Sequence, residues 1–219
     1  MNLWELPVSA FTDEVASDSP APGGGAVAGL QAAVGAALGV MVAQLTQGRK
    51  KYEAFAENAA EAEKKLNSLR GRMLAAMEQD CQAFREVSAA FALPRETEEE
   101  KARRSEAIQE KLRVCTQTPL NLMALCDEAM AAVTSMLGRC NSTCSSDLGM
   151  AALSLKAALQ GAWLNVCINI TSLKDRAFAE ECRKKGEALM ARALPAADRC
   201  FSEVLKSTGV SGPLATEHP

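Results

Sequence analysis

The chain has 219 residues but only one histidine, His218, which stands next to the C-terminus. Hydrolases that use an imidazole as base or metal ligand need a histidine held inside a folded site. A residue so close to a chain end is poorly placed for that role. The sequence therefore argues against a Ser-His-Asp, Cys-His or histidine-based metal centre. Proton transfer would fall to Asp, Glu, Lys or Tyr.

Other functional signals are missing as well. There is no phosphate-binding loop ending in Lys-Ser/Thr and no strand-flanked Gly-x-Gly-x-x-Gly. Cys140 and Cys144 alone supply only half of a tetrahedral shell, so we expect no metal site. A net charge of -3 argues against nucleic acid as a partner. We expect the eight cysteines to be reduced thiols of a cytoplasmic protein, because the N-terminus shows no basic-apolar signal segment.

Aromatic residues make up only 4% of a chain that is 48% hydrophobic, so the core must consist of Ala, Leu, Val and Met. Sustained alternation of apolar and polar residues is absent, whereas helical spacing recurs throughout. We expect an all-α bundle of about six to seven helices, several of them long. A single domain is expected over residues 1–207, followed by a flexible tail over 208–219.

The sequence SPAPGGGA at positions 19–26 predicts a tight turn that opens a helix. Backbone N–H groups at such a helix start can receive an anion. The following run, residues 26–45, is rich in Gly and Ala and free of charge, which permits close helix contact. We expect the small-residue face over 25–39 to form a two-fold interface in a homodimer or higher oligomer.

The same run has about the length of a membrane span, roughly 20 residues. Gln31 and Gln44 interrupt it, and the rest of the chain is amphipathic. A buried helix of a soluble bundle is therefore the favoured interpretation, with no membrane partner.

Asp80 interrupts the apolar stripe of the next helix. Apolar residues recur there at steps of three and four, at Leu66, Leu69, Met73, Met77, Phe84, Val87 and Phe91. Asp80 occupies the position between Met77 and Phe84, where burial would raise its pKa and suit it to proton transfer near neutral pH. A structural aspartate that caps a helix or pairs with an arginine is the alternative.

Two signals of helix boundaries follow that helix. Thr97 and Glu100 have the spacing of a capping box and predict the start of a further helix after Pro94. Pro119 predicts an interruption of that helix, with Thr118 capping its restart.

A helix expected over residues 147–170 presents a small and polar stripe that includes Asn165 and Asn169. Two amides four residues apart can bind a heterocyclic ring or, alternatively, another helix. Asp147 lies about 27 Å from Asn165 along such a helix, so the two cannot touch the same small group. Three roles are then open to Asp147: it stabilises the first turn through the helix dipole, it binds the far end of a long ligand, or it serves a neighbouring subunit.

Residues 49–51 (Arg49, Lys50 and Lys51, hereafter the basic cluster) come directly after the apolar run. A solvated surface is the ordinary interpretation of such a charge run. The alternative is a dock for the carboxylates of a ligand.

Four segments together resemble the C-terminal domain of the formiminotransferase-cyclodeaminase family, which also includes stand-alone methenyltetrahydrofolate cyclohydrolases. They are PAPGGGAVAGLQAAVGAALGVMVAQLTQGRKKY, DCQAFREV, CNSTCSSDL and GAWLNVCINITSLKD. The resemblance implies a helical, oligomeric folate enzyme that needs no cofactor beyond its tetrahydrofolate substrate. It implies Asp80 as the active-site aspartate and a set of substrate-binding residues: Gly23, Gly24, Gly25, Ser146, Asp147, Asn165 and Asn169. As a hypothesis, the glycines and the basic cluster hold the pterin edge or a glutamate tail, polyglutamylated or not.

The expected reaction is formimidoyltetrahydrofolate cyclodeamination, which forms 5,10-methenyltetrahydrofolate and ammonia. The first alternative is the cyclohydrolase reaction, from 5,10-methenyl- to 10-formyltetrahydrofolate. An inactive folate-binding or scaffold protein is an alternative of another class. Both reactions pass through a tetrahedral carbon between N5 and N10 and need one group that moves protons, for which Asp80 is the candidate.

Overall fold

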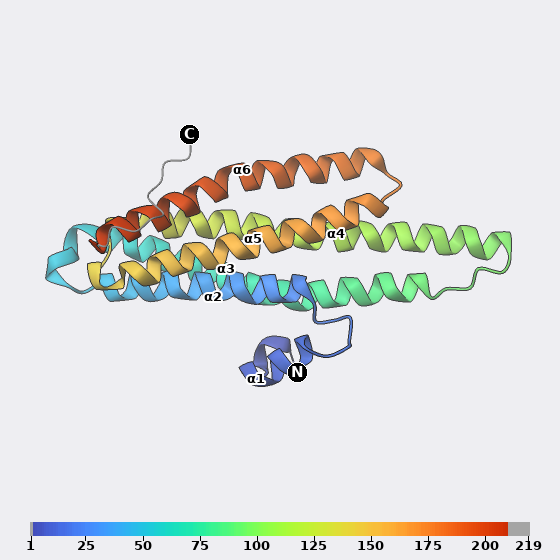
Figure 1. Cartoon of the computed structure of the whole chain (residues 1–219), viewed down its shortest axis with the longest axis horizontal. Helices are drawn as coiled ribbons and strands as arrows, with labels where there is room; N and C mark the ends of the chain where they lie inside the picture. Colours follow the sequence, from blue (N-terminus) through green and yellow to red (C-terminus); the bar gives the residue numbers. More distant parts are fainter. Residues whose placement is uncertain (1, 210–219) are drawn as a thin grey trace.

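The computed structural model describes residues 2–209 as a bundle of long helices (Figure 1). The α-helices are α1 (Val8–Val15), α2 (Gly24–Thr46), α3 (Ala56–Phe91), α4 (Glu98–Ser135), α5 (Ser145–Ser172) and α6 (Arg176–Ser207). Short 3-10 turns are η1 (Leu3–Glu5), η2 (Lys50–Phe55) and η3 (Ser142–Cys144). Residues 2–209 contain no strand, which confirms the all-α prediction. His218 and positions 210–219 of the predicted tail lie outside the described residues.

Several helix ends lie where the sequence predicts them. Gly23 precedes the first turn of α2, and Gly48, at a φ of 69°, follows its end. The capping box before α4 is formed, because the Thr97 hydroxyl accepts from the Glu100 N–H and the Glu100 carboxylate accepts from the Thr97 N–H. The start of α6 has a cap that the sequence analysis did not single out, since the Asp175 carboxylate accepts from the Phe178 N–H. These local contacts fix where each helix enters the bundle.

The predicted break at Pro119 is wrong, because α4 runs continuously through it from Glu98 to Ser135. Thr118 caps no new helix, since its hydroxyl donates to the Val114 carbonyl one turn earlier. Pro119 is buried among the helices. Packing along a long amphipathic face therefore outweighs the single hydrogen bond that proline removes.

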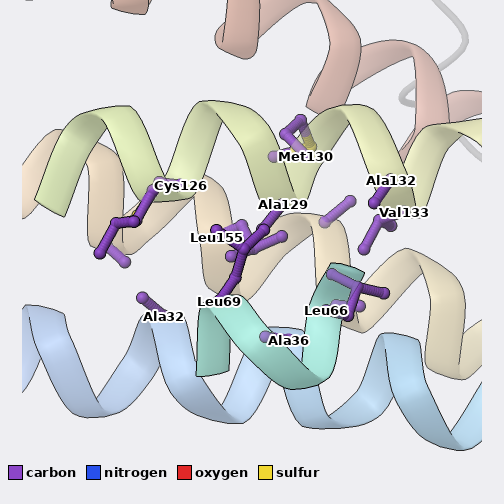
Figure 2. Close-up of a cluster of buried hydrophobic side chains, with 14 of the residues drawn as sticks. Ala32, Ala36, Leu66, Leu69, Cys126, Ala129, Met130, Ala132, Val133 and Leu155 are labelled. Carbon is purple, nitrogen blue, oxygen red and sulfur yellow. The ribbon is translucent and has the colours of Figure 1, made fainter. Parts of the chain in front are cut away.

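The core is built from small residues of α2 and larger side chains of its neighbours. Ala32 and Ala36 of α2 are fully buried against α3, α4 and α5. Figure 2 shows Leu66 and Leu69 of α3, Ala129 of α4 and Leu155 of α5 gathered between the helices. Alanine lets the helix backbones approach, and Leu and Met fill the space between them.

The glycines of α2 do not form a two-fold interface, contrary to the sequence expectation. A Cβ added at Gly29 would lie 2.9 Å from Met77 Cγ, and one at Gly39 would lie 2.7 Å from Leu66 Cδ1. One at Gly35 would lie 3.0 Å from the Ala151 carbonyl oxygen. The same chain covers this face, so close packing inside the bundle explains the small residues.

Phe84 and Phe91 also depart from the predicted core stripe of α3. Their side chains are 37% and 50% exposed, whereas Leu66, Met73 and Met77 of the same stripe are fully buried. The periodicity predicts which face a residue shares, but it cannot tell where the covering helix stops. Here α2 begins at Gly24, opposite Asp80, and leaves the far part of α3 uncovered on that side (Figure 1).

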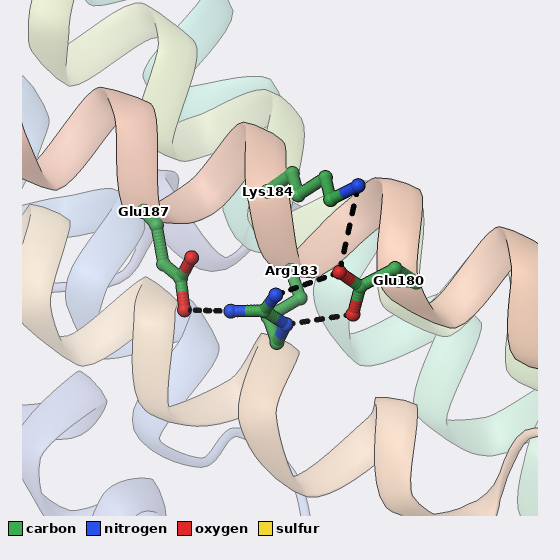
Figure 3. Close-up of polar contacts among 4 residues, drawn as sticks. All are labelled: Glu180, Arg183, Lys184 and Glu187. Atoms are coloured by element: carbon green, nitrogen blue, oxygen red, sulfur yellow. Dashed lines mark hydrogen bonds and ion pairs between the residues drawn. The ribbon is translucent and has the colours of Figure 1, made fainter.

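The outer face of α6 carries a network of ion pairs (Figure 3). Arg183 pairs with both Glu180 and Glu187, and Lys184 lies 3.7 Å from the Glu180 carboxylate. All four side chains are exposed to solvent, so these pairs contribute little to the free energy of unfolding and mainly keep this face of α6 hydrated.

Two segments, Gly24–Thr46 and Ser142–Ser172, are long and apolar enough to cross a membrane by length and composition alone. The bundle buries 61% of the most apolar window of the first and 44% of that of the second. Burial in the core explains the composition of α2 on the sides that face α3 and α5. All eight cysteines are free thiols, as expected.

Candidate active site

Three helices meet at the N-terminus of α2 and bring together residues that are distant in sequence. Asp80 of α3 lies directly against Gly25, where an added Cβ would come within 2.1 Å of the carboxylate oxygen Oδ1. Asn165 of α5 lies beside Gly24, with its amide nitrogen 4.0 Å from the position of an added Cβ. The structure thus joins the predicted aspartate, the glycine turn and one predicted amide in one place.

Burial dominates the electrostatics of Asp80. The side chain is half-buried, and desolvation raises the pKa of its carboxyl above the ordinary value. The backbone N–H of Ala26, in the first turn of α2, donates to the carboxylate and lowers the pKa in part. No Lys or Arg of residues 2–209 pairs with it. Of the structural roles considered for Asp80, the contact with a helix start is present and the arginine pair is not.

The two asparagines of α5 use their amide nitrogens within the bundle. Asn165 donates to the Gly161 carbonyl of its own helix at 3.0 Å. Asn169 donates to the Cys115 carbonyl of α4 at 2.8 Å. Contact between helices, one of the two interpretations of this stripe, is therefore real for Asn169. Any part in ligand binding falls to the amide faces that these bonds leave open.

Cys115 is a neighbour of the site that the sequence did not indicate. Its thiol lies 3.7 Å from the Asn169 amide nitrogen, and burial together with the charge of Asp80 raises its pKa. The thiol is therefore protonated at neutral pH and serves as a small, weakly polar wall. Cys115 follows an ordinary apolar pattern, so no local sequence signal could have placed it here.

The remaining predicted site residues lie at the opposite end of the bundle. The 23 residues of α2 span about 34 Å, and the basic cluster follows the last of them. Ser146 and Asp147 lie in the first turn of α5, at this same end, with Ser146 exposed and Asp147 half-buried. Within one chain, the structure therefore does not bring these residues to Asp80, although the sequence grouped them as one substrate site.

That opposite end has its own ordered polar contacts. The Tyr52 hydroxyl lies 3.1 Å from the Ser142 hydroxyl and accepts from the Ser142 N–H, and both contacts lower the tyrosine pKa. The Asn141 N–H donates to the Thr46 hydroxyl at 2.9 Å. Lys51 lies over the Tyr52 ring, 5.2 Å from its centre. These contacts hold the loop before α5 against the end of α2. Tyr52 was another residue without a sequence signal, since it stood only as the end of a basic run.

The described residues hold no group of three or more His, Cys, Asp or Glu side chains arranged for a metal ion. The chemistry on offer around Asp80 is thus a half-buried acid, backbone N–H groups, amides and a thiol. This set can exchange protons with nitrogen and oxygen atoms of a ligand and can hydrogen-bond a heterocycle.

Comparisons with known proteins identify the family and the fold. The formiminotransferase-cyclodeaminase family matches residues 7–188. A methenyltetrahydrofolate cyclohydrolase of Methylorubrum extorquens is 39% identical over 197 residues, which are 90% of this chain and 95% of that protein. A solved structure of formiminotetrahydrofolate cyclodeaminase from Thermotoga maritima has a TM-score of 0.78 at 25% identity, and covers 94% of this chain and 97% of the other.

A formimidoyltransferase-cyclodeaminase of Rattus norvegicus is 34% identical over 192 residues. The match includes 88% of this chain but only 36% of the rat protein, so the chain spans about a third of that relative. Sequence, helix order and the long match to one family point the same way. The chain belongs to the formiminotransferase-cyclodeaminase family.

Proposed function

We propose that this chain is a folate one-carbon enzyme that opens or closes the N5–carbon–N10 bridge of a tetrahydrofolate derivative, with Asp80 moving the protons. The observation that carries the proposal is the placement of Asp80. Its carboxyl is half-buried, has a raised pKa and lies against the bare backbone of Gly25 at a helix N-terminus. A desolvated carboxyl without a cation partner is suited to accept and return a proton near neutral pH.

The cyclohydrolase reaction is the first choice between the two chemistries of the family. It is supported by the 39% identity to a cyclohydrolase, because the match covers 95% of that protein. This order reverses the expectation from sequence, which put cyclodeamination first. Cyclodeamination stays as the second candidate, because the solved cyclodeaminase shares the fold over 94% of this chain.

In the proposed cyclohydrolase reaction, water adds to the methenyl carbon while the Asp80 carboxylate takes one of its protons. This gives a tetrahedral carbon that carries a hydroxyl group between N5 and N10. The bond from that carbon to N5 then breaks, Asp80 returns its proton to N5, and the hydroxyl proton leaves to solvent as the formyl C=O forms on N10. In the cyclodeaminase reaction, N10 attacks the protonated formimino carbon and Asp80 takes the proton from N10, which gives a tetrahedral carbon that carries an amino group. Asp80 then returns this proton to the amino group as the bond from carbon to that nitrogen breaks, and ammonia leaves.

The other predicted residues take supporting roles in this proposal. The N–H groups of Gly23, Gly24 and Gly25 and the amides of Asn165 and Asn169 hold the pterin. The basic cluster, Ser146 and Asp147 receive the glutamate tail, with or without polyglutamate. We further propose that the protein is a cytoplasmic homodimer, with no cofactor beyond the folate itself.

The proposal is tested by offering the purified protein each substrate separately. The absorbance of the methenyl group should fall with 5,10-methenyltetrahydrofolate if the protein is a cyclohydrolase. It should rise with 5-formiminotetrahydrofolate, with one ammonia released per turnover, if the protein is a cyclodeaminase. Folate binding without turnover of either substrate would contradict the proposal and identify a binding or scaffold protein.

A further inference from the structure

A cavity of about 400 Å³ lies in the seam between α3 and α4 (hereafter the α3/α4 cavity). Its floor is apolar, because Ala76, Leu122 and Leu125 are buried beneath it, and the small side chains of Ala75 and Ala124 leave the seam open. Sites for small molecules have volumes of about 300–1,000 Å³. The α3/α4 cavity is therefore large enough for a ligand of its own.

The α3/α4 cavity is separate from the candidate active site. The face of α3 that meets α2 holds Met73, Met77 and Asp80, which lie against the glycines of α2. Arg72 and Gln79 line the cavity and fall about a third of a turn away from that face, since an α-helix has about 3.6 residues per turn. A ligand in the cavity therefore lies on a different side of α3 from Asp80.

Arg72 is a cation at the rim of the cavity and has no carboxylate partner. The positions three and four residues away on its own helix are Ser68, Leu69, Ala75 and Ala76, so α3 offers it no acid. Within residues 2–209 its guanidinium forms neither an ion pair nor a hydrogen bond. The charge of Arg72 is thus free to meet an anion.

Two acids stand further along the seam, beyond ion-pair distance of Arg72. Glu61 and Glu128 line the next cavity, to which Arg72 also contributes, and Glu128 lies 3.8 Å from the Lys65 ammonium. The planar fork of N–H donors on an arginine matches the two oxygens of a carboxylate. A ligand carboxylate is therefore the group that Arg72 suits best.

The rest of the rim supplies neutral polar groups. Gln79 forms no side-chain hydrogen bond within the described part of the chain. Asn121 accepts from the Gln117 amide nitrogen at 2.9 Å, which leaves its own amide nitrogen free to donate. The Thr118 hydroxyl donates to the Val114 carbonyl, so its oxygen is left to accept. Donors and an acceptor side by side suit the C=O and N–H of an amide.

We propose that the α3/α4 cavity binds a small carboxylate that also carries an amide and an apolar group, as N-acyl amino acids do. Arg72 holds the carboxylate by paired hydrogen bonds. Gln79, Asn121 and Thr118 meet the amide, and the floor of alanines and leucines receives the apolar group. This site is independent of the proposed function, and its tests measure no folate turnover.

The first test compares two ligands that differ in charge. The purified full chain is titrated with N-acetylphenylalanine, which carries a carboxylate, and with N-acetylphenylalaninamide, which is neutral, and nuclear magnetic resonance follows binding. The carboxylate should saturate one site per chain, and the neutral ligand should bind about tenfold more weakly. Equal affinities, or no saturation by the carboxylate below about 10 mM, overturn the proposal.

The second test asks whether Arg72 holds the ligand. Arg72→Gln should lower the affinity for N-acetylphenylalanine about tenfold and leave that for the neutral ligand unchanged. Arg70→Gln is the matched control, because it removes the same charge from an exposed position of α3 that does not line the cavity, and it should bind as the wild-type protein does. Circular dichroism checks that both variants fold. Wild-type affinity in Arg72→Gln, or an equal loss in Arg70→Gln, overturns the proposal.

Discussion

At the scale of single residues, the sequence and the structure both single out Asp80 as a carboxyl among apolar neighbours. It occupies an apolar position of a helical stripe, and the structure leaves it half-buried beside Gly25 with a raised pKa. The sequence could indicate the anomaly but not its partner. Gly25 lies 55 positions earlier in the chain (80 less 25), and only the packing of α3 on α2 brings the two together.

The raised pKa of Asp80 predicts the pH dependence of turnover. The proposed base must be ionised, so kcat should fall as the pH drops through the raised pKa, at a higher pH than the ordinary aspartate value of 3.8 would give. A pH–rate profile between pH 4 and 8 measures this, with sedimentation or circular dichroism as a control for unfolding. An inflection at or below that ordinary value would contradict the assignment.

The contact between Gly25 and Asp80 predicts a large difference between two neighbouring glycines. Gly25→Ala would put a methyl group 2.1 Å from the Asp80 carboxylate and should cost about 1–3 kcal/mol of unfolding free energy. Gly24→Ala is the matched control, since its methyl would meet nothing closer than 4.0 Å, and its stability should change by less than about 0.5 kcal/mol. Denaturant unfolding measures both, and equal effects would contradict the close approach.

At the scale of helices, end signals were more reliable than interruptions. The glycine turn and the Thr97–Glu100 capping box act through neighbouring backbone groups, so the sequence contains them fully. Pro119 misled because its effect depends on what packs around it. Phe84 and Phe91 misled because their exposure depends on where another helix begins.

Asp175 holds the start of α6 by two contacts that can be separated. It caps the Phe178 N–H at 3.0 Å and pairs with Arg113 of α4 at 2.5 Å. Asp175→Ala should lower the free energy of unfolding by about 1–2 kcal/mol, because it loses both contacts. Asp175→Asn keeps a capping oxygen and should lose less than about 1 kcal/mol. Denaturant unfolding compares the two variants, and an equal loss for Asp175→Asn and Asp175→Ala would contradict the expected share of the cap and show that the ion pair dominates.

At the scale of the whole molecule, the sequence predicted the fold class but not the division of the site. Helical periodicity and the lack of strand signals were enough for an all-α bundle. Residues grouped by resemblance had no stated positions in space, and the structure places them at two ends of α2. The small-residue face of α2 was assigned to a partner copy because sequence cannot tell packing within a chain from packing between chains.

Stability and catalysis should oppose each other at Asp80. The pKa of Asp80 is higher in the folded protein than in the unfolded chain. Its contribution to stability is therefore fully present at a pH below the pKa of the unfolded chain, and it is lost as the pH rises through the pKa of the folded protein. At neutral pH the ionised carboxylate therefore costs stability. Asp80→Asn should unfold at an equal or higher denaturant concentration than the wild-type protein at pH 7. A clear loss of stability would instead assign Asp80 a structural role.

The most direct test of the account is the turnover of Asp80→Asn with 5,10-methenyltetrahydrofolate and with 5-formiminotetrahydrofolate, measured beside its folate affinity. If Asp80 moves the protons, kcat should fall by about 10²–10⁴-fold with the active substrate. Folate should still bind with nearly the wild-type dissociation constant, because the amide keeps the size of the side chain. Wild-type turnover in this variant would contradict the central claim.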